Sequence, residues 1–411
     1  TDRCHGCRRC FNLCDSFPKL FDLIDESDSG ELDSVESADF KPIVDACTLC
    51  DMCFLTKCPY VPPHEFNLDF PHLMLRYRAI EFKKGEIGLT TKELTKTDRN
   101  GKLLGAVSPL ANWASDTSNS LTRGALEMTT KVHREAALPK FHKNSFVSLT
   151  EKHKPDVNED APAFGRKAVI YATCFVNYNN PDIGNSALSV LALNGVDTQV
   201  AYPSCCGMPQ LEHGNIEEVA AAAKKVAAEL KTFIDEGRDI IALTPSCALM
   251  LKFEWPLIVP DDADVKALAA STYDIDEYVV DIAKKEGLTP GLKPLDGNVA
   301  LHQACHSRAQ NFGQKSAEML KFIPDLSLNV IERCSGHGGS WGMMKDNFKT
   351  AIKVGKPAAR QASKASPKYV VSGCPLAGEH ILQGIDFLGG SDKRPKNANH
   401  PIEILAKAYN L

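Results

Sequence analysis

From residue 166 onward, short runs of apolar and β-branched residues alternate with longer segments whose apolar residues recur at the helical period. Strand-like runs that alternate with amphipathic helices predict βαβ units on a mostly parallel sheet. The pattern occurs twice, in residues 164–260 (unit one) and 298–411 (unit two), with a connection over 261–297. The expected strands begin at Lys167, Thr198, Asp239, Asn298, Leu328 and Lys368, and the expected helices cover 182–194, 216–236, 309–323 and 343–361.

The segment 216–236 illustrates how these helices are predicted. Its apolar residues, from Ile216 to Ile234, follow the period of one buried helix face. Asn215 and Glu218 form a capping pair at its start, and Gly237 ends it. The pattern favours a crossover helix that covers the sheet over a helix that binds a membrane or a partner.

Each expected strand leads into a cysteine. The offsets between the cysteines that follow successive strands are 31 and 42 residues in unit one and 29 and 40 residues in unit two, so the units share one design. Right-handed crossovers make the strands parallel, and the C-terminal ends of parallel strands meet at one edge of the sheet. We therefore expect the thiols to gather there, Cys174, Cys205, Cys206 and Cys247 from unit one and Cys305, Cys334 and Cys374 from unit two.

A glycine-rich segment, Gly336–Gly342, follows the cysteine of the middle strand in unit two. It lacks both the GK[ST] ending and the GxGxxG spacing of phosphate-binding loops. We expect instead a tight turn that brings backbone amides toward cluster sulfurs and then opens a helix.

The 15 cysteines are unevenly distributed, since eight of them fall in the first 58 residues. Those eight form two runs, each with three cysteines spaced three residues apart and a fourth shortly after. Such a triplet holds three corners of a [4Fe-4S] cubane, and in two-cluster ferredoxins the fourth cysteine ligates the other cluster. Zinc, the alternative, favours CxxC pairs. We expect one cubane on Cys4, Cys7, Cys10 and Cys58 (the first set) and one on Cys14, Cys47, Cys50 and Cys53 (the second set).

Residues 20–40, between the two runs, carry eight acidic side chains and no lysine or arginine. A solvated loop between the clusters is the expected interpretation. The alternative is a docking surface for a basic partner.

The composition restricts the class of protein. With 43% hydrophobic and 24% charged residues, the 411-residue chain fits an ordinary globular protein of several domains. A formal charge of −5 argues against a nucleic-acid partner, and no apolar run approaches the roughly 20 residues of a membrane-spanning helix. Clustered cysteines in a chain of this size indicate metal rather than disulfides. We expect a reducing, cytoplasmic location, or a peripheral position at the cytoplasmic membrane through a partner.

The expected fold is therefore an α+β multidomain chain. A mainly helical ferredoxin domain with two clusters covers 1–85, and a helical or irregular connecting arm covers 86–163, with helices at 106–113 and 121–136. An α/β domain of two repeated βαβαβ units with parallel strands follows.

The cysteine layout resembles a known family. Cys174, then Cys205-Cys206-Gly207, then Cys247 looks like the CCG motif found in the B subunit of heterodisulfide reductase. The whole chain is similar to the C subunit of anaerobic glycerol-3-phosphate dehydrogenase and to glycolate oxidase iron-sulfur subunits, which join a two-cluster ferredoxin to two CCG units. The family closes each unit with CxxC, whereas Met250 and Ala377 stand at those closing positions here, and Ser335 replaces one cysteine of unit two.

The resemblance implies a further iron-sulfur cluster on the four thiols of unit one. Unit two, with three thiols, is expected to hold an additional iron site that needs a fourth ligand or leaves one metal position open. The candidate fourth ligands are His302, His306 and His337, which lie beside the cysteines in the sequence.

The expected function is electron transfer between the two cubanes, the cysteine site of the CCG units and a partner redox protein. The family implies a flavin-dependent dehydrogenase, a quinone or a rubrerythrin-like di-iron protein as partner. One alternative is a disulfide or persulfide reductase that acts at a CCG-bound cluster, with Cys205, Cys206 and Cys334 as candidate catalytic residues. The other is a nonenzymatic redox sensor.

Overall fold

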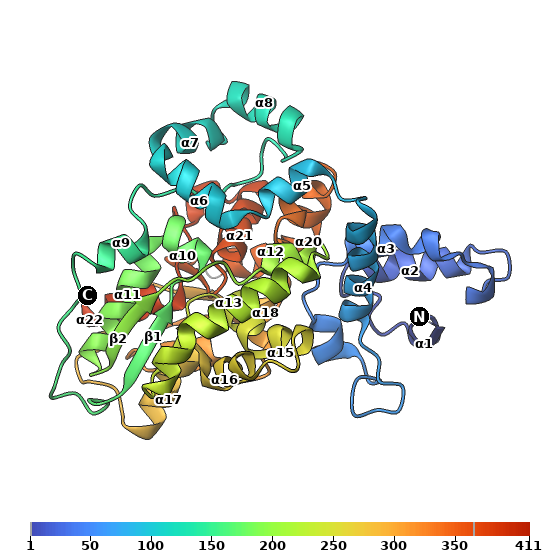
Figure 1. Cartoon of the computed structure of the whole chain (residues 1–411). Coiled ribbons are helices and arrows are strands. Elements are labelled where there is room, and N and C mark those ends of the chain that lie inside the picture. Colours follow the sequence, from blue (N-terminus) through green and yellow to red (C-terminus); the bar gives the residue numbers. More distant parts are fainter. Residues whose placement is uncertain (1, 365) are drawn as a thin grey trace.

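The N-terminal part of the molecule is a helical projection from its main body. The structure is a computed structural model that describes residues 2–364 and 366–411 (Figure 1). Buried apolar side chains of the second helix, among them Phe17 and Ile24, pack against Ile43 and Val44 of the third. The elements are α1 (Asp2–Cys7), α2 (Ser16–Asp25), the short turns η1 (Leu32–Ser34) and η2 (Ser37–Phe40), α3 (Lys41–Ala46), η3 (Cys53–Lys57) and α4 (Phe70–Lys84).

The connecting arm is a chain of short helices along the upper side of the body in Figure 1. A Cβ atom at Gly101 would lie 2.4 Å from the ring of Tyr178, so the arm packs closely on unit one. The expected helix at 121–136 is too long, because Lys131 adopts a left-handed backbone with φ of 62° and ends it. The arm comprises α5 (Leu89–Leu94), α6 (Thr97–Ala106), α7 (Ser108–Ser115), α8 (Ser120–Thr130) and α9 (Phe146–Thr150).

Unit one contains a four-stranded parallel sheet in the order β2-β1-β3-β4. Alternate residues of β1 face opposite sides: Val169 lies in the core under α13 and α16, whereas Ile170 lies in the core under α11 and α17. The fourth strand was not expected from the sequence. The elements are β1 (Lys167–Tyr171), α11 (Pro181–Leu193), β2 (Asp197–Ala201), α13 (Ile216–Asp235), β3 (Asp239–Ala242), α16 (Ala263–Ser271), β4 (Thr272–Asp274) and α17 (Ile275–Lys285).

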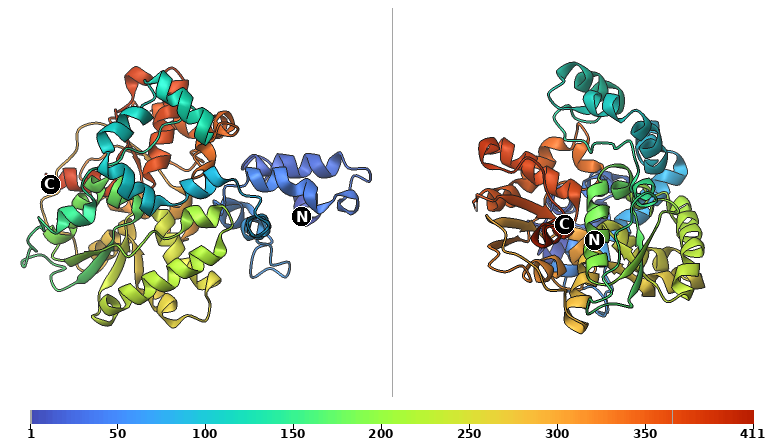
Figure 2. Two further views of the ribbon diagram at one scale, coloured as in Figure 1. Left: turned by 45° about the horizontal axis from the view of Figure 1, so that its top comes forward. Right: turned by 90° about the vertical axis from the view of Figure 1, so that its left-hand side faces the viewer.

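The sheet of unit two is also parallel, with the order β6-β5-β7. One face packs on α20 and α21, and the other shares a core with unit one through α19 and α22. The two sheets thus lie side by side with helices between them (Figure 2). The elements are β5 (Val299–His302), α19 (Lys315–Leu320), β6 (Leu328–Ile331), η5 (Trp341–Met343), α20 (Phe348–Lys364), β7 (Tyr369–Ser372), α21 (Pro375–Phe387), η6 (Ser391–Lys393) and α22 (Pro401–Tyr409).

The α+β arrangement with parallel strands is confirmed. The capping pair of the long helix is also confirmed, because the Asn215 side chain accepts the backbone N–H of Glu218 at 3.3 Å. The single helix expected at 309–323 is wrong. Asn311 and Gly313 adopt left-handed backbones there, with φ of 53° and 87°, and separate α19 from a shorter helix before it.

Candidate metal centre

The thiols of units one and two lie at the C-terminal edges of the two parallel sheets. Cys174 and Cys305 are the first residues of the helices that follow β1 and β5, and Cys374 is the N-cap of α21 after β7. Equivalent strands thus deliver thiols to equivalent places. The short helices at this edge are α10 (Cys174–Tyr178), α12 (Met208–Glu212), α14 (Pro245–Leu249), η4 (Met250–Glu254), α15 (Trp255–Ile258) and α18 (Cys305–Ala309).

The four thiols of unit one form two close pairs. The Sγ atoms of Cys174 and Cys205 are 3.6 Å apart, and those of Cys206 and Cys247 are 3.2 Å apart. The last three of these cysteines are buried. The backbone N–H of Gly207 points at Sγ of Cys205 from 3.5 Å. Unit one therefore presents four sulfurs in one buried group.

A carboxylate from the connecting arm braces this group. Oδ2 of Asp98 in α6 accepts the backbone N–H of Cys205 at 2.9 Å, and Oδ1 accepts the hydroxyl of Tyr202. On the other side, the indole N–H of Trp255 donates to the carbonyl of Cys206 at 3.1 Å. The CCG loop is thus held from two directions.

Unit two presents three thiols in a more open setting. Cys334 is exposed, whereas Cys305 and Cys374 are partly buried. The backbone N–H of Gly336 donates to Sγ of Cys334 at 3.3 Å, so the expected tight turn does bring an amide toward a cysteine sulfur. Ser335 stands at the second position of the pair, and its Oγ accepts the backbone N–H of His337 at 3.4 Å.

One large cavity connects the thiol sites. Its volume is about 1160 Å³, and arm residues such as Leu104 and Leu126 form part of its apolar wall. Thiols from three parts of the chain line it. They are Cys14 and Cys50 of the second set, Cys174, Cys206 and Cys247 of unit one, and Cys305, Cys334 and Cys374 of unit two.

The first set lies apart from this cavity. Its four thiols line a small cavity of their own, in the projection. Two arginines, three aromatic rings and a proline complete the lining. Soft thiolate ligands select iron-sulfur clusters, and cationic side chains favour an anionic group, so this lining fits the expected cubane. The lining residues are Cys4, Cys7, Cys10, Cys58, Arg8, Arg9, Phe17, Phe21, Tyr60 and Pro59.

In the second set, the thiols of Cys47 and Cys53 are buried and those of Cys14 and Cys50 are partly buried. Burial raises the pKa of Cys14 to about 12 and also raises the pKa of Cys47 and Cys53, and these thiols affect one another electrostatically. The guanidinium of Arg78 donates to the carbonyl of Cys47 and, at 2.8 Å, to the carbonyl of Glu212 in unit one. Thiols that are neutral at pH 7 release protons when they bind metal, so metal binding by this set would depend on pH.

Most of the thiols line cavities. Across residues 2–364 and 366–411, no three His, Cys, Asp or Glu side chains converge closely enough to hold one metal ion. The thiols instead surround cavities, as the ligands of a multi-iron cluster do.

The three candidate histidines differ in their surroundings. Both ring nitrogens of His302 are engaged at 3.0 Å, one by a serine hydroxyl and one by a backbone carbonyl. Nε2 of His306 faces the carbonyl of Leu49 at 3.4 Å. His337 lines the large cavity, and its buried Nε2 has no hydrogen-bond partner among the described residues. Of the three, His337 is the one whose nitrogen is free to approach a metal.

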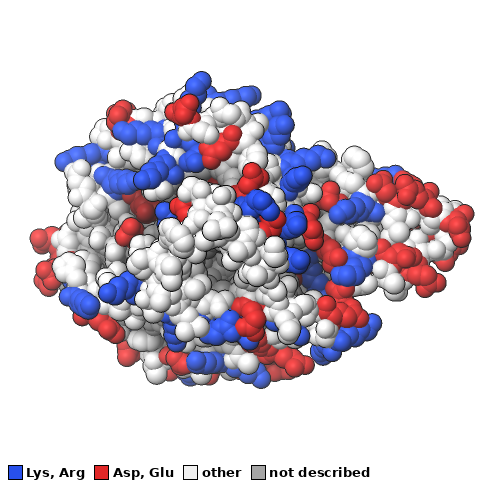
Figure 3. Space-filling view, turned by 90° about the horizontal axis from the view of Figure 1, so that it is seen from above, with Lys and Arg blue, Asp and Glu red and all other residues white. Residues whose placement is uncertain are grey.

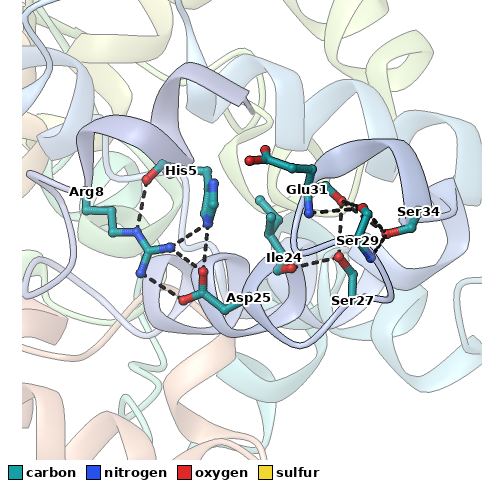
Figure 4. Close-up of polar contacts among 8 residues, drawn as sticks. All are labelled: His5, Arg8, Ile24, Asp25, Ser27, Ser29, Glu31 and Ser34. Atoms are coloured by element: carbon teal, nitrogen blue, oxygen red, sulfur yellow. Dashed lines mark hydrogen bonds and ion pairs between the residues drawn. The ribbon is translucent and has the colours of Figure 1, made fainter.

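The acidic segment forms the exposed tip of the projection. All eight of its carboxylates are exposed, and Figure 3 shows acidic side chains gathered at that end. One of them, Asp25, pairs with Arg8 and His5 from the first cysteine run, which lowers the pKa of Asp25 to about 2 (Figure 4). The tip is therefore attached directly to the loop that carries the first set.

Sequence reasoning missed three polar residues at the site, Arg78, Asp98 and Glu212. Arg78 and Asp98 belong to helices outside the cysteine motifs, and no spacing in the sequence connects them to a thiol. Burial raises the pKa of Glu212, which lines the large cavity, to about 7.

The two units match one known domain. Residues 168–252 and residues 299–378 each fit the model of the CCG cysteine-rich domain. The chain therefore carries two segments that are similar to this domain, as its cysteine layout indicated.

Similar proteins extend the likeness over most of the chain. Over 325 residues the chain is 26% identical to the C subunit of anaerobic glycerol-3-phosphate dehydrogenase from Escherichia coli (strain K12), an alignment that covers 77% of this chain and 76% of that protein. Lactate utilization protein A of Bacillus pumilus is 28% identical, with 43% of this chain and 75% of the relative aligned. The B subunit of fumarate reductase (CoM/CoB) from Methanothermobacter marburgensis is 27% identical, with coverages of 60% and 47%.

None of the helices that the structure describes is both long enough and apolar enough to span a bilayer.

Proposed function

We propose that this chain is an iron-sulfur electron-transfer subunit of an oxidoreductase. The observation that carries the proposal is the shared cavity, because thiols of the second set and of both CCG units line it together. Bound clusters would supply one-electron transfer. The chain's own residues would hold two cubanes in the projection, a further cluster in unit one and an iron site in unit two.

The relatives support a role beside a partner enzyme. Two of them are named as subunits of a dehydrogenase and of a reductase. By analogy we place a flavin-dependent dehydrogenase first among the partners, with a quinone or a di-iron protein as the other possibilities. The first set lies at the acidic tip, so a partner with a basic surface would find a complementary field there.

Iron and sulfide quantification on anaerobically purified protein tests the proposal, together with EPR of the oxidised and reduced states. About twelve irons per chain would match the two cubanes and one further cluster in unit one, and a higher count would indicate iron in unit two as well. About eight would mean that the CCG units hold none. Zinc in place of iron would overturn the proposal.

A second candidate, disulfide reduction, is favoured by one observation. The Sγ atoms of Cys206 and Cys247 lie 3.2 Å apart at the wall of the large cavity, where a small disulfide has room to enter. Turnover of small disulfides with a reduced viologen, lost in Cys206→Ser, would support a reductase. No turnover by fully loaded protein would reject it.

A further inference from the structure

We infer that the second set exchanges electrons with unit two in preference to unit one, and that His306 is the side chain that joins the two sites. The inference rests on the proposed electron-transfer function. It assigns His306 a positioning role between two thiol sites rather than a place as a metal ligand.

The contact that carries the inference connects two cysteine loops. His306 follows Cys305, and its Nε2 lies 3.4 Å from the carbonyl oxygen of Leu49, which precedes Cys50. A thiol of unit two and a thiol of the second set are therefore joined through covalent bonds and one polar contact. Electron tunnelling decays less steeply along bonds and hydrogen bonds than across empty space, so this contact is a favoured path.

A second contact between the same regions supports the path. The loop after Cys334 packs on the second run, because a Cβ atom at Gly338 would lie 2.6 Å from the side chain of Thr48. Two of the three thiol-bearing loops of unit two, those of Cys305 and Cys334, thus contact residues 48 and 49.

Unit one is joined to the second set in a different way. The side chain of Arg78 stands between them and donates both to the carbonyl of Cys47 and to that of Glu212. Glu212 lies six residues beyond Cys206, so the connection to a unit-one thiol is longer. The side-chain N–H of Gln310 in unit two donates to the carbonyl of Pro245, near Cys247, at 3.5 Å. This contact extends the electron path from unit two into unit one.

The proposed step is a single electron transfer. One electron would pass from a reduced cluster held by the second set to an oxidised iron site held by unit two, and no bond or proton would change place. A viologen radical supplies the electron to the first and second sets.

The test compares His306→Leu with His306→Gln. Leucine keeps bulk but has no donor, whereas the glutamine amide can place an N–H near the position of Nε2. The protein is reduced rapidly by the viologen radical, frozen at increasing delays, and followed by EPR. We expect His306→Leu to slow the reduction of the unit-two site several-fold, and His306→Gln to retain most of the rate. His64→Leu is the matched control, because the ring of His64 packs against Tyr60, which lines the cavity of the first set, and it should leave this rate unchanged.

Iron content and midpoint potentials are measured on the same samples. Unchanged values in both variants, with the slower rate in His306→Leu, would support the inference. A wild-type rate in fully loaded His306→Leu would overturn it and leave the proposed function intact. Loss of iron in both variants would also overturn it, since His306 would then be a ligand. Wild-type protein without iron-sulfur clusters would overturn the proposed function and the inference together.

Discussion

Units one and two differ in their thiols far more than in their folds. In both, the central strand has its neighbours in the same order, and the thiols follow the strand ends. Unit one nevertheless holds four thiols in two close pairs, whereas unit two holds three, with an exposed Cys334 and Ser335 in place of a cysteine. Strand ends and short helices position the sulfurs, so a ligand can be lost without loss of the scaffold. The difference between the units is chemical rather than architectural.

The largest expected effect comes from removal of a thiol in each unit. Cys206→Ser removes one of the four thiols of unit one, three of which are buried. If these thiols hold the proposed cluster, we expect the whole cluster of that unit to be lost, about four irons per chain. Cys334→Ser removes an exposed thiol from a unit that has only three, so the loss should be smaller. Iron quantification and EPR measure both variants. Equal iron losses would remove the distinction between the units.

The next effect concerns the glycine that follows the cysteine pair in each unit. Gly207 and Gly336 both have left-handed backbones, with φ of 83° and 80°. A Cβ atom at Gly207 would lie 3.3 Å from a methyl of Val219, but one at Gly336 would lie 2.1 Å from the backbone oxygen of Ala351 in α20. Alanine at Gly207 should cost about 1–2 kcal/mol through backbone strain alone.

At Gly336 the clashing atom belongs to the backbone of α20, which cannot move aside as a side chain can. Alanine there should therefore lower the free energy of unfolding by more than about 3 kcal/mol. Hydrogen exchange followed by mass spectrometry resolves the two units separately. Gly336→Ala should expose unit two to exchange, and Gly207→Ala should change unit one only modestly. A larger increase of exchange in unit one of Gly207→Ala than in unit two of Gly336→Ala would contradict the expected difference.

The strands and the cysteines that follow them could be predicted from the sequence because both depend on local patterns. A short continuous apolar run locates β1, apolar residues at the helical period locate α13, and parallel strands place Cys174 and Cys305 at the sheet edges. The break between α18 and α19 escaped prediction because the segment keeps helical apolar spacing, although Asn311 adopts a left-handed backbone.

The polar supports of the site could not be predicted in the same way. Asp98 reaches Cys205 from 107 residues away, and Arg78 reaches Cys47 from 31 residues away. Such contacts depend on how the arm and the projection fold back on the body. The spacing of residues in a single sequence does not predict contacts of this kind.

A smaller effect is expected when the missing cysteine of unit two is restored. Ser335 is buried between Cys334 and Gly336, so Ser335→Cys would give unit two the CCG sequence and a fourth thiol. We expect a gain of iron in unit two and a new or sharper EPR signal, with unit one unchanged. Ser335→Ala, which adds no ligand, is the control. An unchanged iron content would mean that the number of thiols is not what limits unit two.

The smallest expected effect concerns the contacts between the projection and the two units, which are charged on the side of unit one and uncharged on the side of unit two. His72 in α4 lies 2.6 Å from Asp69 and 3.1 Å from Glu254 of unit one, whereas the contacts of unit two with Leu49 and Thr48 carry no charge. The carboxylates of Asp69 and then Glu254 accept hydrogen bonds from the His72 ring, which raises the pKa of His72 to about 10, above the value of about 6.5 in an unfolded chain.

The folded protein therefore holds this proton more tightly than the unfolded chain does. The stabilisation is complete below pH of about 6.5 and is lost as the pH rises toward about 10. Because His72 is partly exposed, we expect a loss of only about 1 kcal/mol across this window. Exchange in α4 should increase with pH in the wild type and less so in His72→Gln, while exchange at residues 48 and 49 responds equally in both. An identical pH response of α4 in the two proteins would show that the ion pair does not anchor the projection to unit one.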